Sequence, residues 1–415
     1  LRNYVLDTLE LITQFDMHRG LAGVTTNHLT ITTGMQHNPF EIIALAKQLG
    51  CDWMMVKGYN DWMLANPVRN ALASVQDPFT WISGQSVSGG SIYGLERYPD
   101  IQDNTIEQCL AYAEDRGGYY FGNLSGATDE LRARYNGYLV NESGAQDQID
   151  ELNAPILTEA GNIEHAAPPT MVAFLERGVS LTKTTLFDAI LNKRAVTIYP
   201  NGVIEGPRKL RDPLYLLLLE GTVLEKHFGG TLTVSASISN GLLTIRVNNK
   251  STKTVQAELT ITSCDGLRVS DQNSELSLSL APQELHVRSY PIELLPVAND
   301  RNNLVSVSVT TQESTTRALA HVDVPPLVSM HPLIFNAPGD VTYPVSVWNT
   351  TQEDNVPVEV FVKKRSSGEL ILQKKLTIVA TPWHEGRTTL DLKLAPGDYT
   401  IEAHALGVTA TGIMA

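Results

Sequence analysis

The chain has 415 residues, with 31 Lys and Arg against 45 Asp and Glu, which gives a formal net charge of −14. Its length predicts two or three domains, and its acidic balance excludes a general affinity for nucleic acid. Hydrophobic residues make up 42% and charged residues 18%, which excludes a disordered chain.

The first half of the chain, up to about residue 229, alternates short apolar runs with amphipathic stretches of helical period. This alternation is typical of parallel βα units, and it predicts an α/β domain, a (β/α) TIM-type barrel, over 1–229. The expected helices are 4–15, 39–49, 105–115, 169–176 and 213–227. The expected strands are 21–25, 53–56, 79–83, 119–122, 137–140, 155–158, 179–182 and 195–199.

The second half of the chain loses the helical period, and its segments alternate apolar and polar side chains between Asn-Gly and Asn-Lys turns. This pattern predicts antiparallel β-structure. Because Pro325 and Pro326 interrupt it, we expect a β-sandwich at 230–325 and a second, Ig-like sandwich at 326–415. No repeat of fixed period is apparent, and no apolar stretch is long enough to span a membrane.

Polar motifs in the first half follow one another in a distinctive order. They are a strand ending in Asn27, then Gly58-Tyr59-Asn60-Asp61, Asp77-Pro78-Phe79, Pro155-Ile156-Leu157-Thr158-Glu159-Ala160-Gly161 and His227-Phe228-Gly229. In this order they resemble the second half of clan A retaining glycoside hydrolases, especially the arabinofuranosidase-like and heparanase-like families. The resemblance covers roughly residues 8–260, and its register makes 1–15 the second barrel helix.

An incomplete barrel follows from this resemblance, because its register lacks the first two barrel strands. An open barrel exposes unpaired strand edges and apolar interior, so we expect an oligomer or a complementing chain to cover them.

The resemblance implies that Glu159 is the nucleophile and Asp61 the acid/base of a retaining reaction. That chemistry uses two carboxyl groups about 5–5.5 Å apart. The alternative role of Asp61 is to cap a helix that starts at Trp62. Glu142 is a competing acid, because Asn141-Glu142 after a strand repeats the Asn-acid order of the family's acid/base motif.

Further polar residues follow the expected strands and are candidates for sugar binding. Asn60 is a candidate for the sugar 2-hydroxyl or is a turn residue, and Tyr120 is a candidate or a core residue. The remaining candidates, each of which could also be an ordinary surface residue, are Asn27, His28, Lys57 and Lys183. The two lysines suit an anionic sugar such as a uronate.

We therefore expect a retaining glycoside hydrolase that acts on a polysaccharide or oligosaccharide. The alternative is a non-catalytic, glycosidase-like surface or assembly protein. No cofactor and no metal are expected, because neither His28 with His37 nor Glu164 with His165 has a third ligand at suitable spacing. The low-charge, Ser- and Thr-rich composition indicates a secreted or cell-surface location.

Overall fold

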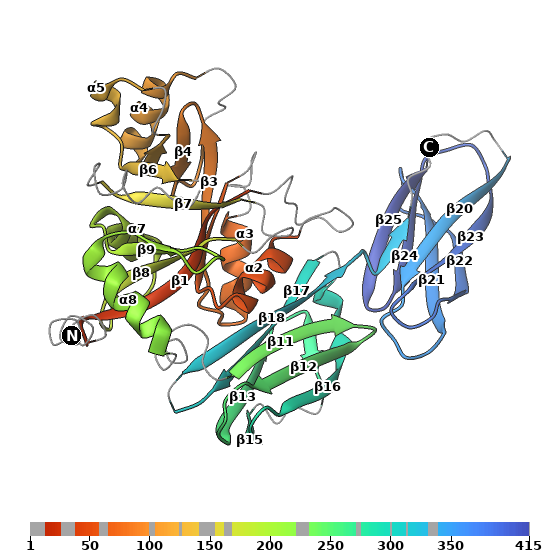
Figure 1. Cartoon of the computed structure of the whole chain (residues 1–415). Helices are drawn as coiled ribbons and strands as arrows, with labels where there is room; N and C mark the ends of the chain where they lie inside the picture. The colour runs from red at the N-terminus through yellow and green to blue at the C-terminus, as the bar shows by residue number, and fades with distance from the viewer. Residues whose placement is uncertain are drawn as a thin grey trace.

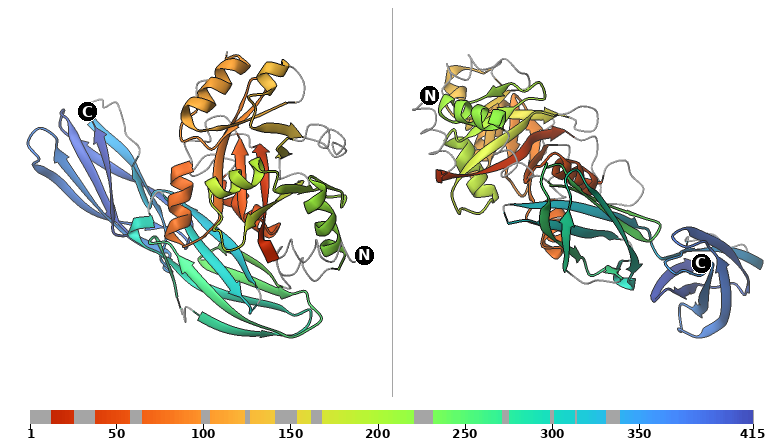
Figure 2. Two further views of the ribbon diagram at one scale, coloured as in Figure 1. Left: turned by 90° about the vertical axis from the view of Figure 1, so that its left-hand side faces the viewer. Right: turned by 60° about the horizontal axis from the view of Figure 1, so that its bottom comes forward.

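The computed structural model describes residues 13–25, 38–57, 65–98, 104–123, 127–140, 154–161, 168–220, 232–270, 275–298, 301–312, 314–330 and 339–414. These residues are mostly β-structure and form three successive units, a barrel followed by two sandwiches (Figure 1). Figure 2 shows the second sandwich at the far end of the first, away from the barrel.

The first unit is built on a closed barrel of seven strands within the described residues. Five neighbouring pairs are parallel and β4 runs antiparallel to both of its neighbours. The barrel strands are β1 (Phe15–Thr25), β2 (Trp53–Lys57), β3 (Thr80–Val87), β4 (Gly90–Tyr93), β5 (Tyr119–Gly122), β6 (Gly137–Val140) and β7 (Ile156–Gly161). The helices around them are α2 (Pro39–Gln48), α3 (Ala65–Ser74), α4 (Ile106–Arg116) and α5 (Asp129–Arg132).

The barrel continues into an antiparallel extension because β1 changes partners along its length. Its first half pairs with β8 (Thr170–Glu176), and its second half pairs with β2 and β7. β9 (Ala195–Ile198) and β10 (Ile204–Glu205) follow β8, with the helices α7 (Lys183–Leu191) and α8 (Arg208–Glu220). The change of partner occurs at Gly20, where a Cβ atom would lie 2.1 Å from the Trp53 ring.

The prediction of a (β/α) TIM barrel, and with it the identification as a clan A glycoside hydrolase, is wrong. The described residues contain no eight-stranded parallel barrel, because β3 and β4 form a hairpin inside the barrel wall. The turn between them contains Gly89 with φ +70°, so the chain reverses and adds an antiparallel strand before the helix expected at 105–115. Short apolar runs predict strands without their direction, which depends on hydrogen-bonding partners far away in the sequence.

The expectation of an open, N-terminally incomplete barrel is also wrong. β7 pairs with β1 through Ala22 opposite Glu159 and Val24 opposite Gly161, so the wall closes within this chain. Closure removes the reason for a complementing chain, since the unpaired edges that such a chain would cover are absent from the described barrel.

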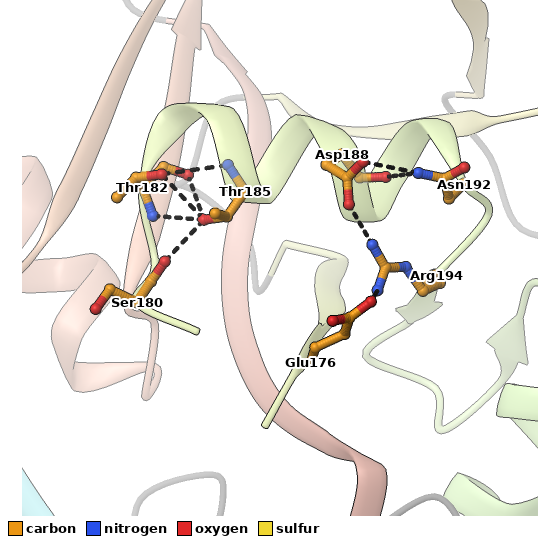
Figure 3. Close-up of polar contacts among 7 residues, drawn as sticks. All are labelled: Glu176, Ser180, Thr182, Thr185, Asp188, Asn192 and Arg194. Carbon is orange, nitrogen blue, oxygen red and sulfur yellow. Dashed lines mark hydrogen bonds and ion pairs between the residues drawn. The ribbon is translucent and has the colours of Figure 1, made fainter. Parts of the chain in front are cut away.

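Two expected elements around residue 175 exchange their roles. Residues 169–176 were predicted as a helix and form β8, in which Thr170–Leu175 are all buried between β1 and β9. Residues 179–182 were predicted as a strand and instead lead into α7. There Thr182 and Thr185 form a reciprocal capping box, and Arg194 joins Asp188 of the helix to Glu176 of β8 (Figure 3).

The expected β-sandwich structure is confirmed in the second half of the chain. The first sandwich packs β11-β12-β16-β14 against β15-β13-β17-β18, and the second packs β19-β20-β23 against β22-β21-β24-β25. The first contains β11 (Leu232–Ser239), β12 (Leu242–Asn249), β13 (Val255–Ser263), β14 (Leu267–Val269), β15 (Glu275–Leu280), β16 (Leu285–Leu294), the 3-10 turn η2 (Pro296–Ala298), β17 (Arg301–Thr310) and β18 (Thr315–Val324). The second contains β19 (Val328–Met330), β20 (Gly339–Trp348), β21 (Asn355–Lys364), β22 (Leu370–Val379), β23 (Glu385–Leu394), β24 (Tyr399–Ala405) and β25 (Val408–Met414).

The two sandwiches share a buried asparagine loop. The Asn249 side chain donates to the carbonyls of Lys253, Leu280 and Ala281 and accepts from Ser251. One hundred residues later the same contacts recur: Asn349 donates to the carbonyls of Glu353 and Ala380 and accepts from Thr351. The sequence analysis found no repeat, because the two loops share little more than the Asn and a hydroxyl two residues later.

A buried carboxylate, Asp77, links the barrel to the first sandwich. Asp77, before β3, accepts from Lys47 of α2 at 2.8 Å, from the Phe79 amide and from Ser306 of β17. Burial lowers the pKa of Lys47, and the negative charge of Asp77 opposes that shift. Leu304 and Leu319 of the sandwich complete the apolar cluster under α2 and α3. The two units therefore share one core.

Replacing either loop asparagine with alanine should lower the free energy of unfolding of its sandwich by about 2–4 kcal/mol, because several buried backbone groups lose their partner. Both asparagines are 0% exposed. Urea denaturation of Asn249→Ala and Asn349→Ala measures this, with Asn248→Ala on the half-exposed neighbouring position as the control. Equal stability of Asn249→Ala and Asn248→Ala would contradict the prediction.

Gly20→Ala should destabilise the barrel by about 2 kcal/mol or more, because the added methyl group overlaps the Trp53 ring. The same substitution in a Trp53→Leu background should cost much less, since the smaller side chain leaves room. Thermal unfolding of the wild type, the two single variants and the double variant measures the coupling free energy between the two positions. Additive effects would show that the two side chains do not compete for the same space.

Candidate functional site

The candidate active site lies where β2 and β7 end. Lys57 of β2 and Glu159 of β7 form a direct ion pair, and their side chains are only 10% and 11% exposed. Lys57 and Glu159 each lie two residues after an interior residue of their strand, Met55 and Leu157, so both side chains point into the barrel. The two strands flank β1, whose inward residue Ala22 is opposite Glu159 and is small enough for the pair to form across it.

Two buried hydroxyl groups on β4 complete the polar part of the barrel interior. Tyr93 and Ser91 are both 0% exposed, and beyond each other their hydroxyl groups have no hydrogen-bond partner among the described residues. Burial raises the pKa of Tyr93 well above its usual value, and the negative charge of Glu159 adds to the rise. Tyr93 therefore stays protonated at neutral pH and keeps a proton to donate.

Tyr93 and Ser91 were not among the predicted site residues, because no strand was expected at 90–93. Gly89 and Gly90, followed by two polar residues that alternate with Ile92, are consistent with a hairpin. This alternation after two glycines is the sequence pattern that could have predicted the β-hairpin.

The strand that carries Glu159 is held in place from outside the barrel. The Thr158 hydroxyl is 2.6 Å from that of Thr197 on β9. Next to it, the Tyr199 hydroxyl donates to the buried carboxylate Glu205 of β10 at 3.0 Å. The antiparallel extension thus fixes β7 directly beside Glu159.

Two of the predicted substrate-binding residues lie elsewhere. Tyr120 points outward, donates to the Ser88 carbonyl at 2.7 Å and contacts the Tyr135 ring, so it is a core residue beneath α4. Lys183 opens α7 and donates to the Gly94 carbonyl at 2.9 Å. Phe187 of the same helix stacks on Tyr119, the first residue of β5. This contact lies at the amino end of the barrel strands, whereas Glu159 lies at the carboxyl end.

The remaining predicted site residues lie outside the described residues. They are Asp61, Glu142, Asn60, Asn27 and His28. The described strand β6, which precedes Glu142, lies beside β7 with Val140 opposite Thr158. The described strand β2, which precedes Asn60 and Asp61, carries Lys57.

A cavity of about 560 Å³ lies at the other end of the barrel. Residues that precede β2 and β3 line it, together with the start of β18 from the first sandwich. His18 and Asp52 form a hydrogen bond of 3.3 Å in its wall. Of the lining residues only Pro78 and Phe79 belong to a motif named from the sequence, and most of the others lie at the amino ends of strands or on a separate domain.

Metal ligands and membrane spans were searched for in the described part of the chain. No group of three or more His, Cys, Asp or Glu there could hold a metal ion. No described helix is both long and apolar enough to cross a membrane. Cys51, Cys109 and Cys264 are all free thiols.

No protein-family model matches the chain, and no curated protein matches it. Among solved structures, it is similar to native alpha-2-macroglobulin from Escherichia coli, from domain MG7 to the C-terminus, with 12% identity and a TM-score of 0.22 over 33% of this chain and 24% of that one. A two-domain fibronectin type-III segment of chicken tenascin has 16% identity and a TM-score of 0.18, over 44% of this chain and 96% of that one. The Salmonella alpha-2-macroglobulin mutant Y1175G has 13% identity and a TM-score of 0.19, over 44% and 16%. Similarities of this size identify neither a family nor a function.

Lys57→Met should destabilise the barrel by about 2–4 kcal/mol, because it leaves the Glu159 carboxylate largely buried without its counter-charge. The double variant Lys57→Met, Glu159→Leu should be more stable than Lys57→Met alone, since no uncompensated charge remains. Urea denaturation of the single and double variants measures the coupling. The exposed pair Arg268–Glu293 is the control, and Arg268→Met should change stability by less than about 1 kcal/mol. A double variant no more stable than Lys57→Met would contradict this account.

Proposed function

We propose that this protein is a glycoside hydrolase that acts on a polysaccharide or oligosaccharide at the carboxyl ends of β2 and β7. The observation that supports this is the Glu159 carboxylate held by Lys57 inside the barrel, together with two buried hydroxyl groups that no other described residue hydrogen-bonds.

Glu159 is proposed as the nucleophile. A carboxylate attacks the anomeric carbon only in its ionised form, and inside a barrel that charge needs compensation. The Lys57 ammonium provides it. The interaction occupies Lys57, so we no longer assign this lysine to an anionic group of the substrate.

Tyr93 and Ser91 are proposed to serve the substrate rather than the fold. A buried hydroxyl that the protein leaves with few partners is costly, so each such group calls for a partner such as a water molecule or a ligand. A sugar offers hydroxyl groups that both donate and accept hydrogen bonds. The interior therefore has the chemistry of a carbohydrate site.

The acid/base partner is proposed to be Asp61 or Glu142. Each follows a described strand that ends on the same side of the barrel as Glu159, because β2, β6 and β7 run in the same direction. A retaining enzyme needs one such acid about 5–5.5 Å from the nucleophile.

A second candidate function is a non-catalytic carbohydrate-binding or assembly protein. The direct Lys57–Glu159 contact favours it, since the pair neutralises the carboxylate while no substrate is present. Under either function, we propose that the protein is secreted or lies at the cell surface and that it forms an oligomer.

Glu159→Gln should reduce hydrolysis of activated aryl glycosides by about 10³-fold or more, because the amide cannot form the glycosyl–enzyme bond. The experiment screens the wild type on a panel of aryl furanosides, pyranosides and uronides, and then assays the variant on the best substrate. Glu176→Gln is the matched control, since Glu176 lies at the end of β8 and pairs with Phe15, away from the site. Equal loss in both variants, or none in Glu159→Gln, would contradict the assignment.

Glu159→Ala gives a sharper test, because it leaves space for an external nucleophile. Added azide should restore turnover by attacking the anomeric carbon directly. This single displacement inverts the anomeric configuration, whereas the two displacements of the wild-type reaction retain it, so the product should be a glycosyl azide of inverted configuration. Absence of hydrolysis over the whole panel by the wild type, combined with retention on an insoluble polysaccharide, would reject the hydrolase and support the binding protein.

A further inference from the structure

The cavity at the junction of the barrel and the first sandwich has the size of a small-molecule site. Its volume of about 560 Å³ falls within the range of ligand pockets, which occur preferentially between domains. One wall comes from the amino ends of β1, β2 and β3, and the other from the β17–β18 hairpin. Ser180, between β8 and α7, adds a hydroxyl group that takes part in none of the contacts drawn in Figure 3.

Arg317 is a cation of this cavity that has no acidic partner among the described residues. No hydrogen bond or ion pair joins its guanidinium to another described residue, although the side chain is only half exposed. The neighbouring cation, Lys47, is already paired with Asp77 at 2.8 Å and lies 5.3 Å from the centre of the Phe79 ring. Arg317 therefore has five N–H donors that the described residues leave unused.

The acidic residues of the cavity are already engaged. Asp52 is 3.3 Å from the Nδ1 atom of His18, and Asp16 accepts from the Gly178 amide at 2.8 Å. Neither carboxylate contacts Arg317. Each carboxylate is thus hydrogen-bonded to a group other than Arg317, and the cavity contains a guanidinium without an acidic partner among the described residues, in a chain whose net charge is −14.

We propose that the junction cavity binds a small oxyanion-bearing molecule, a carboxylate or a phosphate on a sugar-sized body, with Arg317 as the anchor. A guanidinium matches the two oxygens of either group in bidentate geometry. The hydroxyl groups of Ser180 and Ser314 provide neutral donors and acceptors for the body of the ligand. Glu159 lies at the other end of the barrel, so this site is separate from the proposed active site.

Isothermal titration of the full chain with inorganic phosphate, D-glucuronate and D-glucose tests the proposal. At least one anion should bind and raise the melting temperature, whereas glucose should do neither. Binding only of phosphate identifies a phosphate ligand, and binding only of glucuronate identifies a carboxylate ligand. Binding should weaken as salt concentration rises.

Arg317→Gln should weaken the binding of that anion by about tenfold or more. Arg246→Gln is the matched control, because Arg246 is an exposed arginine of the same sandwich, on β12 outside the cavity. Thr315→Glu is a second variant that keeps Arg317 and places a carboxylate in the cavity wall, where it should compete with the ligand. Glu159→Gln should bind the anion as tightly as the wild type does, because Glu159 lies outside the cavity. Anion binding can therefore be tested even if the protein shows no glycosidase activity.

Three results would overturn the proposal. The first is that neither anion binds, and the second is that Arg317→Gln and Thr315→Glu both bind as tightly as the wild type. The third is that Arg246→Gln weakens binding as much as Arg317→Gln does, which would show diffuse attraction to the surface.

Discussion

Strand β1 pairs with three other strands, and the architecture of the first unit depends on this. Its first half belongs to the antiparallel extension with β8, and its second half closes the barrel between β2 and β7. The change of partner is possible because Gly20 has no side chain, so the Trp53 ring can pack directly on the backbone of β1. The register with β2 also shifts between Leu21 and Val24. Without this branch, β7 would be an unpaired edge.

Barrel closure also creates the chemistry of the interior. Lys57 and Glu159 are 102 residues apart, and they meet only because β1 brings β2 and β7 to its two sides. Each charge would be costly alone in so buried a place, so each depends on the other. The extension reinforces this arrangement from outside, where Thr197 contacts Thr158 next to Glu159. The proposed active site is thus a product of strand pairing rather than of any local motif.

The junction with the first sandwich depends on a second buried charge. Asp77 binds Lys47, the Phe79 amide and Ser306, so one carboxylate links two segments of the barrel unit to β17. Leu304 and Leu319 extend the barrel's outer core into the sandwich. This shared core places the β17–β18 hairpin against the amino end of the barrel, and the junction cavity with Arg317 lies between them. The second sandwich contacts the first through an apolar group, since the Trp383 ring packs against Gly241 and belongs to the core of the first sandwich.

The sequence alone determined where many strands form, including those at 53–57, 119–122 and 137–140, and the Asn240-Gly241 hairpin, whose two residues both have positive φ. These features follow from local alternation and turn chemistry. The tertiary structure decided the direction of β4, the strand at 170–176, closure through β7, the contacts of Glu159 and the proximity of Arg317 to Lys47. An apolar run fits a helix, a parallel strand or an antiparallel strand equally well, and only the residues that pair with it from far along the chain select one of them.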